Sequence, residues 1–186
     1  QIWHVYRKVY LPTFTLFDEG RFWAAGDRLR AFDTRFGRLA LTICRDAWHL
    51  SMAYLSVMDG ADLILTISAG PAWSSSPGED RLSRAIGWEE MLRQTAGLFT
   101  VYQAYCNRVG VEDGVSFFGG SILAGPAGNV IARAPDLEEA LITANVDARA
   151  LDRVRQRSPF LRDEKLDLTL RELKRIARER YDGVER

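Results

Sequence analysis

Short apolar or alternating runs, bounded by turn residues, recur along this chain and predict a series of β-strands. The run at residues 39–43 (Leu-Ala-Leu-Thr-Ile) is almost entirely apolar, as expected for a strand that is covered on both faces. Residues 61–67 predict a second buried strand of the same kind. The other predicted strands are residues 2–6, 29–32, 99–106, 121–124, 130–134 and 140–146.

Helical patterns alternate with these strands. Residues 49–58 predict one helix, and a polar loop at residues 74–78 leads into a long helix that ends near Leu98. A short helix begins at Asp147, after the last predicted strand. Strands and helices that alternate, followed by a hairpin with its turn at residues 125–129, predict an α/β fold with a mixed sheet and helices packed outside it.

The chain divides into a globular domain, residues 1–160, and a C-terminal arm, residues 161–186. From residue 163 the arm sets leucines and an isoleucine among many charges, which is typical of an amphipathic helix docked on a neighbour or of a solvated helix. The first residue is Gln1, not Met, and an apolar run follows it directly. Since strands seldom open a domain without a preceding segment, we expect the natural protein to begin further upstream.

Composition excludes several classes of function. A chain of 186 residues with 47% hydrophobic content can bury a core, and its formal net charge of zero gives no general attraction to nucleic acid or to an anionic membrane. Its apolar runs are too short to span a bilayer, and no signal peptide pattern opens the chain. The two cysteines do not form a disulfide framework. We therefore expect a soluble protein of a reducing compartment, the cytoplasm.

Three residues are candidates for chemistry. Cys44 directly follows the buried strand at residues 39–43 and precedes a predicted helix, a position where backbone N–H groups favour a thiolate. Without other information, a cysteine after an apolar strand is more often a small core residue. Lys8 ends the first predicted strand and by itself predicts a surface lysine. Glu19 lies in a loop rich in large aromatic residues, which is unusual for a plain solvated loop.

Five segments occur in an order that resembles the nitrilase superfamily of carbon–nitrogen hydrolases. Residues 6–12 read Tyr-Arg-Lys-Val-Tyr-Leu-Pro, and the aromatic-rich loop that follows closes in Gly-Asp at residues 26–27. Residues 43–48 read Ile-Cys-Arg-Asp-Ala-Trp. Asn-Arg-Val-Gly at residues 107–110 and Phe-Gly-Gly-Ser at residues 118–121 complete the set. Each segment is weak alone, but the ordered set is specific.

The resemblance implies an αββα sandwich, with a mixed sheet and outer helices, and a Glu-Lys-Cys triad. It implies that Cys44 is the nucleophile, Lys8 the triad lysine and Glu19 a second glutamate near the site. The general-base glutamate of the family lies upstream of the lysine. Seven residues precede Lys8 and none of them is acidic. We therefore expect either an N-terminally truncated chain or a base supplied from elsewhere.

The chemistry that the resemblance implies needs no cofactor. A thiolate attacks an amide or carbamoyl carbon, a thioester forms, and ammonia or an amine leaves. The backbone N–H of Arg45 is a candidate donor to the developing oxyanion. Ser68, at the end of a buried strand, is expected to border the pocket, and Trp48 to form a wall of it. Asp46 fits a structural partner or helix cap better than an acid catalyst.

Several alternatives stay open at this point. Within the family, the Arg-Asp-Ala-Trp sequence after Cys44 favours amide or carbamoyl hydrolysis over nitrile hydrolysis, and a glutaminase domain that supplies ammonia to a synthetase uses the same chemistry. A truncated, non-catalytic scaffold subunit is the alternative from another class. A cysteine–histidine pair would need His4 or His49. No cluster has metal-ligand spacing. The expected partners are a small-molecule substrate and further copies of the chain in a homodimer or larger homo-oligomer.

Overall fold

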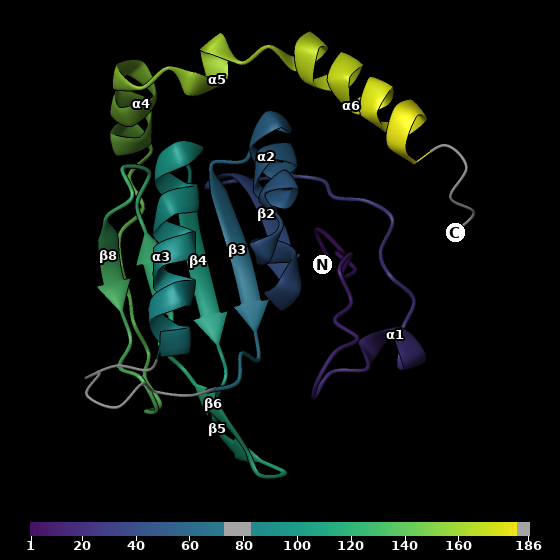
Figure 1. Cartoon of the computed structure of the whole chain (residues 1–186). Helices are drawn as coiled ribbons and strands as arrows, with labels where there is room; N and C mark the ends of the chain where they lie inside the picture. Colours follow the sequence, from purple (N-terminus) through teal and green to yellow (C-terminus); the bar gives the residue numbers. More distant parts are fainter. Residues whose placement is uncertain (73–82, 182–186) are drawn as a thin grey trace.

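The computed structural model describes residues 1–72 and 83–181, and its centre is a six-stranded mixed sheet in the order β1-β2-β3-β4-β7-β8 (Figure 1). A separate two-stranded ribbon, β5-β6, projects from one end of the molecule. The strands are β1 (Phe32–Thr34), β2 (Gly37–Ile43), β3 (Leu63–Ser68), β4 (Tyr102–Asn107), β5 (Val109–Glu112), β6 (Val115–Phe118), β7 (Ile122–Ala124) and β8 (Val130–Arg133).

The middle of the sheet is parallel. β2, β3 and β4 run in the same direction, so their carboxyl ends meet at one edge, whereas β1, β7 and β8 pair antiparallel with their neighbours. Parallel strands are normally buried on both faces, which accounts for the nearly continuous apolar sequence of β2 and β3. Two buried threonines, Thr42 and Thr66, share a hydrogen bond of 2.7 Å across these strands, so each hydroxyl has a partner.

Two helices, α2 (Leu50–Met58) and α3 (Ser83–Leu98), cover one face of the sheet (Figure 1). The core beneath α2 consists of small and β-branched residues, whereas the core beneath α3 combines aromatic residues with alanines and aliphatic residues. The fully buried Trp88 of α3 stacks on Tyr105 of β4, with ring centroids 4.5 Å apart. The core residues under α3 are Ala85, Trp88, Leu92, Ala96, Tyr105, Phe118, Ile122 and Ala124.

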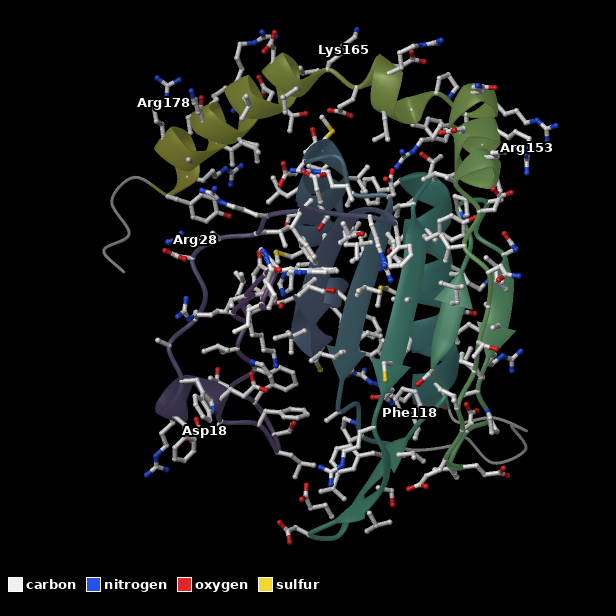
Figure 2. All side chains as sticks on the ribbon, turned by 180° about the vertical axis from the view of Figure 1, so that it is seen from behind. Asp18, Arg28, Phe118, Arg153, Lys165 and Arg178 are labelled. Carbon is white, nitrogen blue, oxygen red and sulfur yellow. The ribbon has the colours of Figure 1, made fainter. Side chains whose placement is uncertain are left out.

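The expectation of an α/β fold with a mixed sheet and outer helices is confirmed. Of the four layers of an αββα sandwich, the described residues form one helix layer and one large sheet. Seen from behind, the segment before β1 runs alongside the β2 edge of the sheet, with the short helix α1 (Glu19–Phe22) at its outer side (Figure 2). This segment carries Lys8 and Glu19, so the fold brings it back to the strand that leads to Cys44.

Three strand predictions were wrong. Residues 2–6 and 140–146 are apolar but extended without a strand partner among the described residues, and β1 begins at Phe32 rather than covering residues 29–32. Apolar alternation indicates a strand only when a neighbouring strand pairs with it, and these segments have none in the described part of the chain. The β5-β6 hairpin was not predicted, because each of its strands has only four residues and β5 is mostly exposed.

The remaining predictions follow the structure more closely. The helix at residues 49–58 and the strands at residues 39–43, 61–67 and 121–124 are confirmed, each within two residues at either end. The polar loop at residues 74–78 lies outside the described residues.

Helices α4 (Ala148–Arg157), α5 (Phe160–Asp163) and α6 (Leu166–Arg180) cross the end of the sheet opposite the β5-β6 hairpin (Figure 1). Arg155 anchors α4, because its guanidinium donates to Asp62 at 2.9 Å and to the backbone carbonyls of Ala61 and Thr100 at 3.2 Å. No residue of α6 is buried, whereas Leu161, in the segment before it, packs against the core, and the division into a domain and a C-terminal arm stays a prediction. Among the described helices, none has the length and apolar content needed to cross a membrane.

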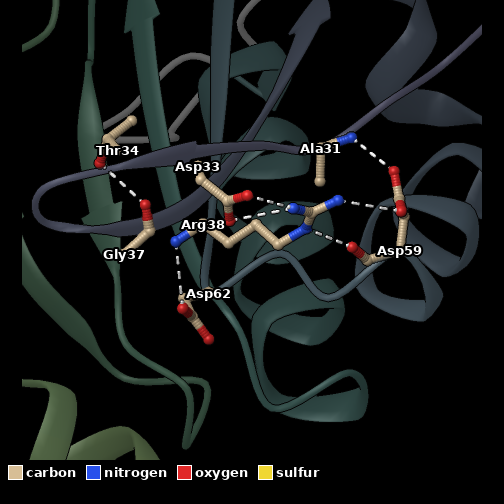
Figure 3. Close-up of polar contacts among 7 residues, drawn as sticks. All are labelled: Ala31, Asp33, Thr34, Gly37, Arg38, Asp59 and Asp62. Atoms are coloured by element: carbon tan, nitrogen blue, oxygen red, sulfur yellow. Dashed lines mark hydrogen bonds and ion pairs between the residues drawn. The ribbon is translucent and has the colours of Figure 1, made fainter.

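A charged cluster closes the amino end of β2 (Figure 3). Arg38 donates to both carboxylate oxygens of Asp33 at 2.9 Å, and to the carboxylate and backbone carbonyl of Asp59 at 3.2 and 2.6 Å. Asp59 also accepts the backbone N–H of Ala31 at 2.7 Å. These bonds tie the chain that enters β1 to the end of α2, far along β2 from Cys44.

Candidate active site

A cavity of about 410 Å³ lies where the carboxyl ends of β2, β3 and β4 meet. Each of these strand ends places one polar side chain in its wall: Cys44 follows β2, Ser68 ends β3 and Arg108 follows β4. Lys8 and Glu19 reach the same cavity from the N-terminal segment. Strand ends of parallel sheets commonly carry binding sites, because loops rather than the rigid strands surround them.

Cys44 occupies a strained turn. It is the first residue of a 3₁₀ turn, η1 (Cys44–Trp48), and its φ of 47° lies in the left-handed region that non-glycine residues rarely adopt. Such backbone strain costs on the order of 1–3 kcal/mol and is concentrated at functional sites. The turn redirects the chain sharply at the end of β2 and leaves the Cys44 side chain in the cavity wall.

Lys8 and Glu19 form an ion pair in the cavity. The ammonium nitrogen of Lys8 lies 2.7 and 2.6 Å from the two carboxylate oxygens of Glu19, and the two side chains are 12% and 29% exposed. Glu19 opens α1, where its backbone N–H donates to the carbonyl of Pro12 at 3.1 Å. Charge-assisted bonds of this length hold the ammonium group in one place.

The Gly-Asp closure at residues 26–27 holds the lysine segment by close backbone contact. The N–H of Gly26 donates to the carbonyl of Lys8 at 2.7 Å. A side chain at this position would place its Cβ 2.3 Å from the carbonyl oxygen of Arg7, so no residue other than glycine fits without a backbone shift. This contact accounts physically for the glycine in that part of the sequence pattern.

Asn107 and Arg108 are neighbours in sequence but make different contacts. Asn107 accepts the N–H of Gly70 at 2.8 Å and donates to the carbonyl of Gly119 at 2.9 Å, so it joins the loops after β3 and β6. Arg108 lines the cavity, stacks over Phe117 at 4.6 Å and pairs with a glutamate of the β5-β6 hairpin. The sequence pattern contained Arg108, but nothing in it indicated that this side chain reaches the cavity.

The other predicted site residues lie around the turn. Trp48 packs edge-on against Trp88 at 5.1 Å in the core, and the described residues that line the cavity do not include it. The guanidinium of Arg45 stacks over Phe14 at 5.2 Å, and the predicted role of its backbone N–H stays a prediction. Burial raises the pKa of Tyr105, whose ring lies under this region, well above its ordinary value, so its phenol stays neutral.

Neither histidine lines the cavity with Cys44. His49 stacks on Tyr10, with ring centroids 3.4 Å apart, and His4 stacks on Phe32 at 4.5 Å. Burial, and then the nearby positive charge of Arg45, lower the pKa of His49 below its ordinary value. The structure therefore offers no support for a cysteine–histidine mechanism.

A larger cavity, of about 620 Å³, lies at the opposite end of the sheet. Its wall includes Asp62, Leu63, Tyr102 and Val146, and it contains no cysteine, lysine, arginine or histidine among the described residues. Size alone does not make a catalytic site. The smaller cavity is the candidate because a thiol, an ammonium group and a carboxylate converge on it.

Known proteins of the carbon–nitrogen hydrolase family are similar to this chain. The carbon-nitrogen hydrolase family model matches residues 1–156. The chain is 29% identical over 173 residues to N-carbamoylputrescine amidase of Arabidopsis thaliana, covering 88% of this chain and 57% of that protein. It is 34% identical over 149 residues to glutamine-dependent NAD(+) synthetase of Thermotoga maritima, covering 79% of this chain and 24% of that protein.

A solved structure gives the same result. The carbon-nitrogen hydrolase of Helicobacter pylori G27 superposes with a TM-score of 0.83 at 30% identity, covering 94% of this chain and 62% of that one. This chain thus spans less than two thirds of the length of these relatives. The chain belongs to the carbon-nitrogen hydrolase family of the nitrilase superfamily, in its amidase- and carbamoylase-like branch.

Proposed function

We propose that the protein hydrolyses a non-peptide carbon–nitrogen bond of a small amide or carbamoyl compound and releases ammonia or an amine. The observation that carries the proposal is that Cys44, Lys8 and Glu19 line one cavity, although 36 residues separate the first two in the sequence. The family assignment supports the reaction class. Since the chain spans 57% of its plant relative, the proposal concerns the whole protein.

In the proposed reaction, Cys44 is the nucleophile. Its thiolate attacks the carbonyl carbon, a tetrahedral intermediate forms, and the collapse of that intermediate expels the nitrogen group and leaves a thioester. Water then cleaves the thioester and regenerates the thiol. The strained turn at Cys44 supports this role, because it holds the partly buried thiol in the cavity wall, where one side of the residue packs against the core.

Lys8 stabilises the oxyanion in this proposal. Its ammonium group lies in the cavity and Glu19 holds it, so little reorganisation is needed when negative charge develops on the substrate oxygen. The backbone N–H of Arg45 is the second donor that we assign. Loss of one donor of this kind costs about 2.7–4 kcal/mol of transition-state stabilisation.

Glu19 has the role of holding Lys8 rather than of general base. Both of its carboxylate oxygens accept from the lysine, and it is the one carboxylate among the described residues that line the cavity. A general base must accept the thiol proton and later activate water, which a carboxylate occupied by an ammonium group does poorly. The base that the resemblance implies is a further glutamate of the whole protein.

A glutaminase activity that supplies ammonia to a synthetase is the second candidate. The 34% identity to a glutamine-dependent NAD(+) synthetase favours it, and the chain covers 24% of that protein. The chemistry at Cys44 would be the same. Free glutamine as the preferred substrate would identify this function.

The test is a substrate panel on the full-length protein, with ammonia release as the readout. The panel contains N-carbamoyl amines, short linear amides, a nitrile and glutamine. We expect turnover of an amide or carbamoyl compound, its loss in Cys44→Ala, and its retention in Cys106→Ala, the other free cysteine. A folded protein that hydrolyses none of these compounds would instead favour the non-catalytic scaffold subunit.

A homodimer or larger homo-oligomer and a cytoplasmic location stay predictions. The exposed apolar residues of α6 are one candidate surface for contact between copies. Light scattering on the full-length protein and on a variant that ends at residue 163 will measure the oligomeric state. Fractionation of the source cells will test the cytoplasmic location.

A further inference from the structure

Asp46 is a fully buried carboxylate, with 0% of its surface exposed, two residues after Cys44. A buried carboxylate is costly unless hydrogen bonds satisfy it. Among the described residues, Asp46 accepts four hydrogen bonds, and none of them comes from a basic side chain. Its donors come from the two parts of the chain that carry the candidate nucleophile and the candidate lysine.

One oxygen of Asp46 holds the lysine segment. Oδ1 accepts the backbone N–H groups of Val9 and Tyr10, at 3.2 and 2.8 Å. These two residues directly follow Lys8, so the carboxylate fixes the backbone from which the lysine side chain extends. The donors are 37 and 36 residues away from Asp46 in the sequence.

The other oxygen joins the nucleophile turn to the lysine segment. Oδ2 accepts the backbone N–H of Ile43 at 3.0 Å and the hydroxyl of Tyr6 at 2.7 Å. Ile43 precedes Cys44, so this bond closes the turn in which Cys44 adopts its positive φ. Burial, and then the bond to Asp46, raise the pKa of Tyr6 above its ordinary value, and its hydroxyl therefore stays a donor across the physiological pH range.

From these contacts we propose that Asp46 is a positioning residue: its single carboxylate sets the Lys8 backbone against the Cys44 turn and so fixes the ammonium group relative to the thiol. This inference rests on the proposed function, in which these two side chains act together. We do not assign Asp46 as a catalytic acid, because it is fully buried and is not among the described residues that line the cavity.

The proposed role depends on the two acceptor oxygens of the Asp46 carboxylate. A carboxylate has two acceptor oxygens, whereas an amide has one acceptor and one donor group. In Asp46→Asn, one side of the amide would face N–H or O–H donors with its own N–H₂ group. Either the N–H groups of Val9 and Tyr10 or the N–H of Ile43 would then lose their acceptor. This loosens the contact between the two segments, and a displacement of about 1 Å at a reacting group can lower a rate about a hundredfold.

Asp59 supplies a matched control. It is also an aspartate that ties an entering segment to the domain, since it accepts the N–H of Ala31 at 2.7 Å and pairs with Arg38 (Figure 3). Unlike Asp46, it lies at the amino end of β2, away from Cys44. Asp59→Asn therefore reports the effect of a lost structural carboxylate without a change in the site.

The test is a double-mutant cycle on the full-length protein. Wild type, Lys8→Ala, Asp46→Asn and the double variant are compared for kcat, KM and thermal midpoint, with Asp59→Asn as control. We expect Asp46→Asn to lower kcat about a hundredfold with a KM changed less than threefold. In the Lys8→Ala background, we expect it to lower kcat less than threefold more, because it acts through the lysine.

The rate of Cys44 alkylation by iodoacetamide, in a Cys106→Ala background, gives a second readout that needs no turnover. We expect Lys8→Ala and Asp46→Asn to slow it, and the double variant to match the slower single one. If Asp46→Asn does not fold, Tyr6→Phe replaces it in these measurements. This variant removes one of the four hydrogen bonds to Asp46, and we expect a smaller decrease in kcat and in alkylation rate.

The outcomes separate the two claims. Additive losses in the cycle, or a loss in kcat no larger than that of Asp59→Asn at an equal drop in thermal midpoint, would overturn the positioning role. A wild-type protein that hydrolyses no compound, but whose alkylation rates follow the expected pattern, would overturn the proposed function and leave the positioning role supported.

Discussion

The ammonium group of Lys8 lies 2.7 and 2.6 Å from the two carboxylate oxygens of Glu19, inside the cavity that also contains the Cys44 side chain. The pair is partly shielded from water, at 12% and 29% exposure of its side chains. A surface lysine would not need such a partner. The pair therefore gives the first test of whether this lysine acts in catalysis.

Replacement of Lys8 by methionine keeps the length of the side chain and removes its charge. We expect kcat to fall about 10²–10³-fold, the usual cost of one lost oxyanion donor, with a smaller effect on KM. Steady-state kinetics with the best substrate of the panel measure this. Lys165→Met, at the start of α6 and remote from the cavity, is the control and should keep wild-type kinetics. A Lys8→Met variant with unchanged kcat would remove Lys8 from the mechanism.

Gly26→Ala should displace the lysine segment, because the added Cβ would lie 2.3 Å from the carbonyl oxygen of Arg7. We expect a lower thermal midpoint and a lower kcat, since the hydrogen bond from Gly26 to Lys8 must lengthen. Gly87→Ala is a matched control in α3, where the Cβ meets nothing within 4 Å. There a stabilisation of about 0.5–1 kcal/mol is expected from the higher helix propensity of alanine. Equal effects of the two substitutions would contradict the close contact at Gly26.

Arg108→Gln should act on substrate binding. Its guanidinium lines the cavity but stacks on Phe117 instead of contacting Cys44 or Lys8 in any described hydrogen bond. We expect KM to rise several-fold more than kcat falls, measured across the panel. Arg93→Gln, at a solvent-exposed position on α3 where the side chain donates to a backbone carbonyl, serves as the comparison and should change neither constant. A drop confined to kcat would place Arg108 in the chemical step instead.

Arg38→Met should lower stability and leave the kinetics unchanged. The substitution removes the guanidinium donor from the carboxylates of Asp33 and Asp59 and from one backbone carbonyl (Figure 3). Because these side chains are largely solvent-exposed, we expect a small decrease in the free energy of unfolding, measured by urea denaturation. A changed kcat at full folding would show that this end of β2 communicates with the cavity.

The pH dependence of stability should contain a contribution from His49. Its pKa in the fold is below the ordinary value of 6.5, because burial and Arg45 disfavour the imidazolium. Below that value the unfolded chain binds a proton that the folded protein resists, so stability should fall as the pH drops through 6.5 and level off below the folded pKa. His49→Phe keeps an aromatic ring against Tyr10 and should lack this loss. Urea denaturation at a series of pH values will compare the two proteins.

Strands and helices that depend on a local pattern of apolar residues could be predicted from the sequence. The strands before Cys44 and Ser68 are nearly all apolar, and a buried strand leaves little choice in such a run. The resemblance named Cys44, Lys8 and Glu19, and the structure brings them to one cavity. The sequence did not indicate that the Arg108 side chain lines the cavity, because the direction of a side chain at a strand end depends on the conformation of the loop that follows.

Two kinds of feature were beyond the sequence. Residues 140–146 have the alternation of a strand, yet a strand needs a partner, and pairing is a property of the whole fold. The four donors of Asp46 include three that lie 36 to 40 residues upstream, and no local pattern reveals them. A short polar side chain next to a nucleophile looks the same in sequence whether it caps a turn or joins two segments.

The three parallel strands at the centre of the sheet each end in a different part of the cavity wall, with Cys44 after β2, Ser68 at the end of β3 and Arg108 after β4. In the proposed reaction, the bond is broken at the end of one strand, and the substrate is bound at the end of another. Because the two strand ends belong to one parallel sheet, substitution of Arg108 can change the compound that binds while the backbone turn at Cys44 keeps its conformation.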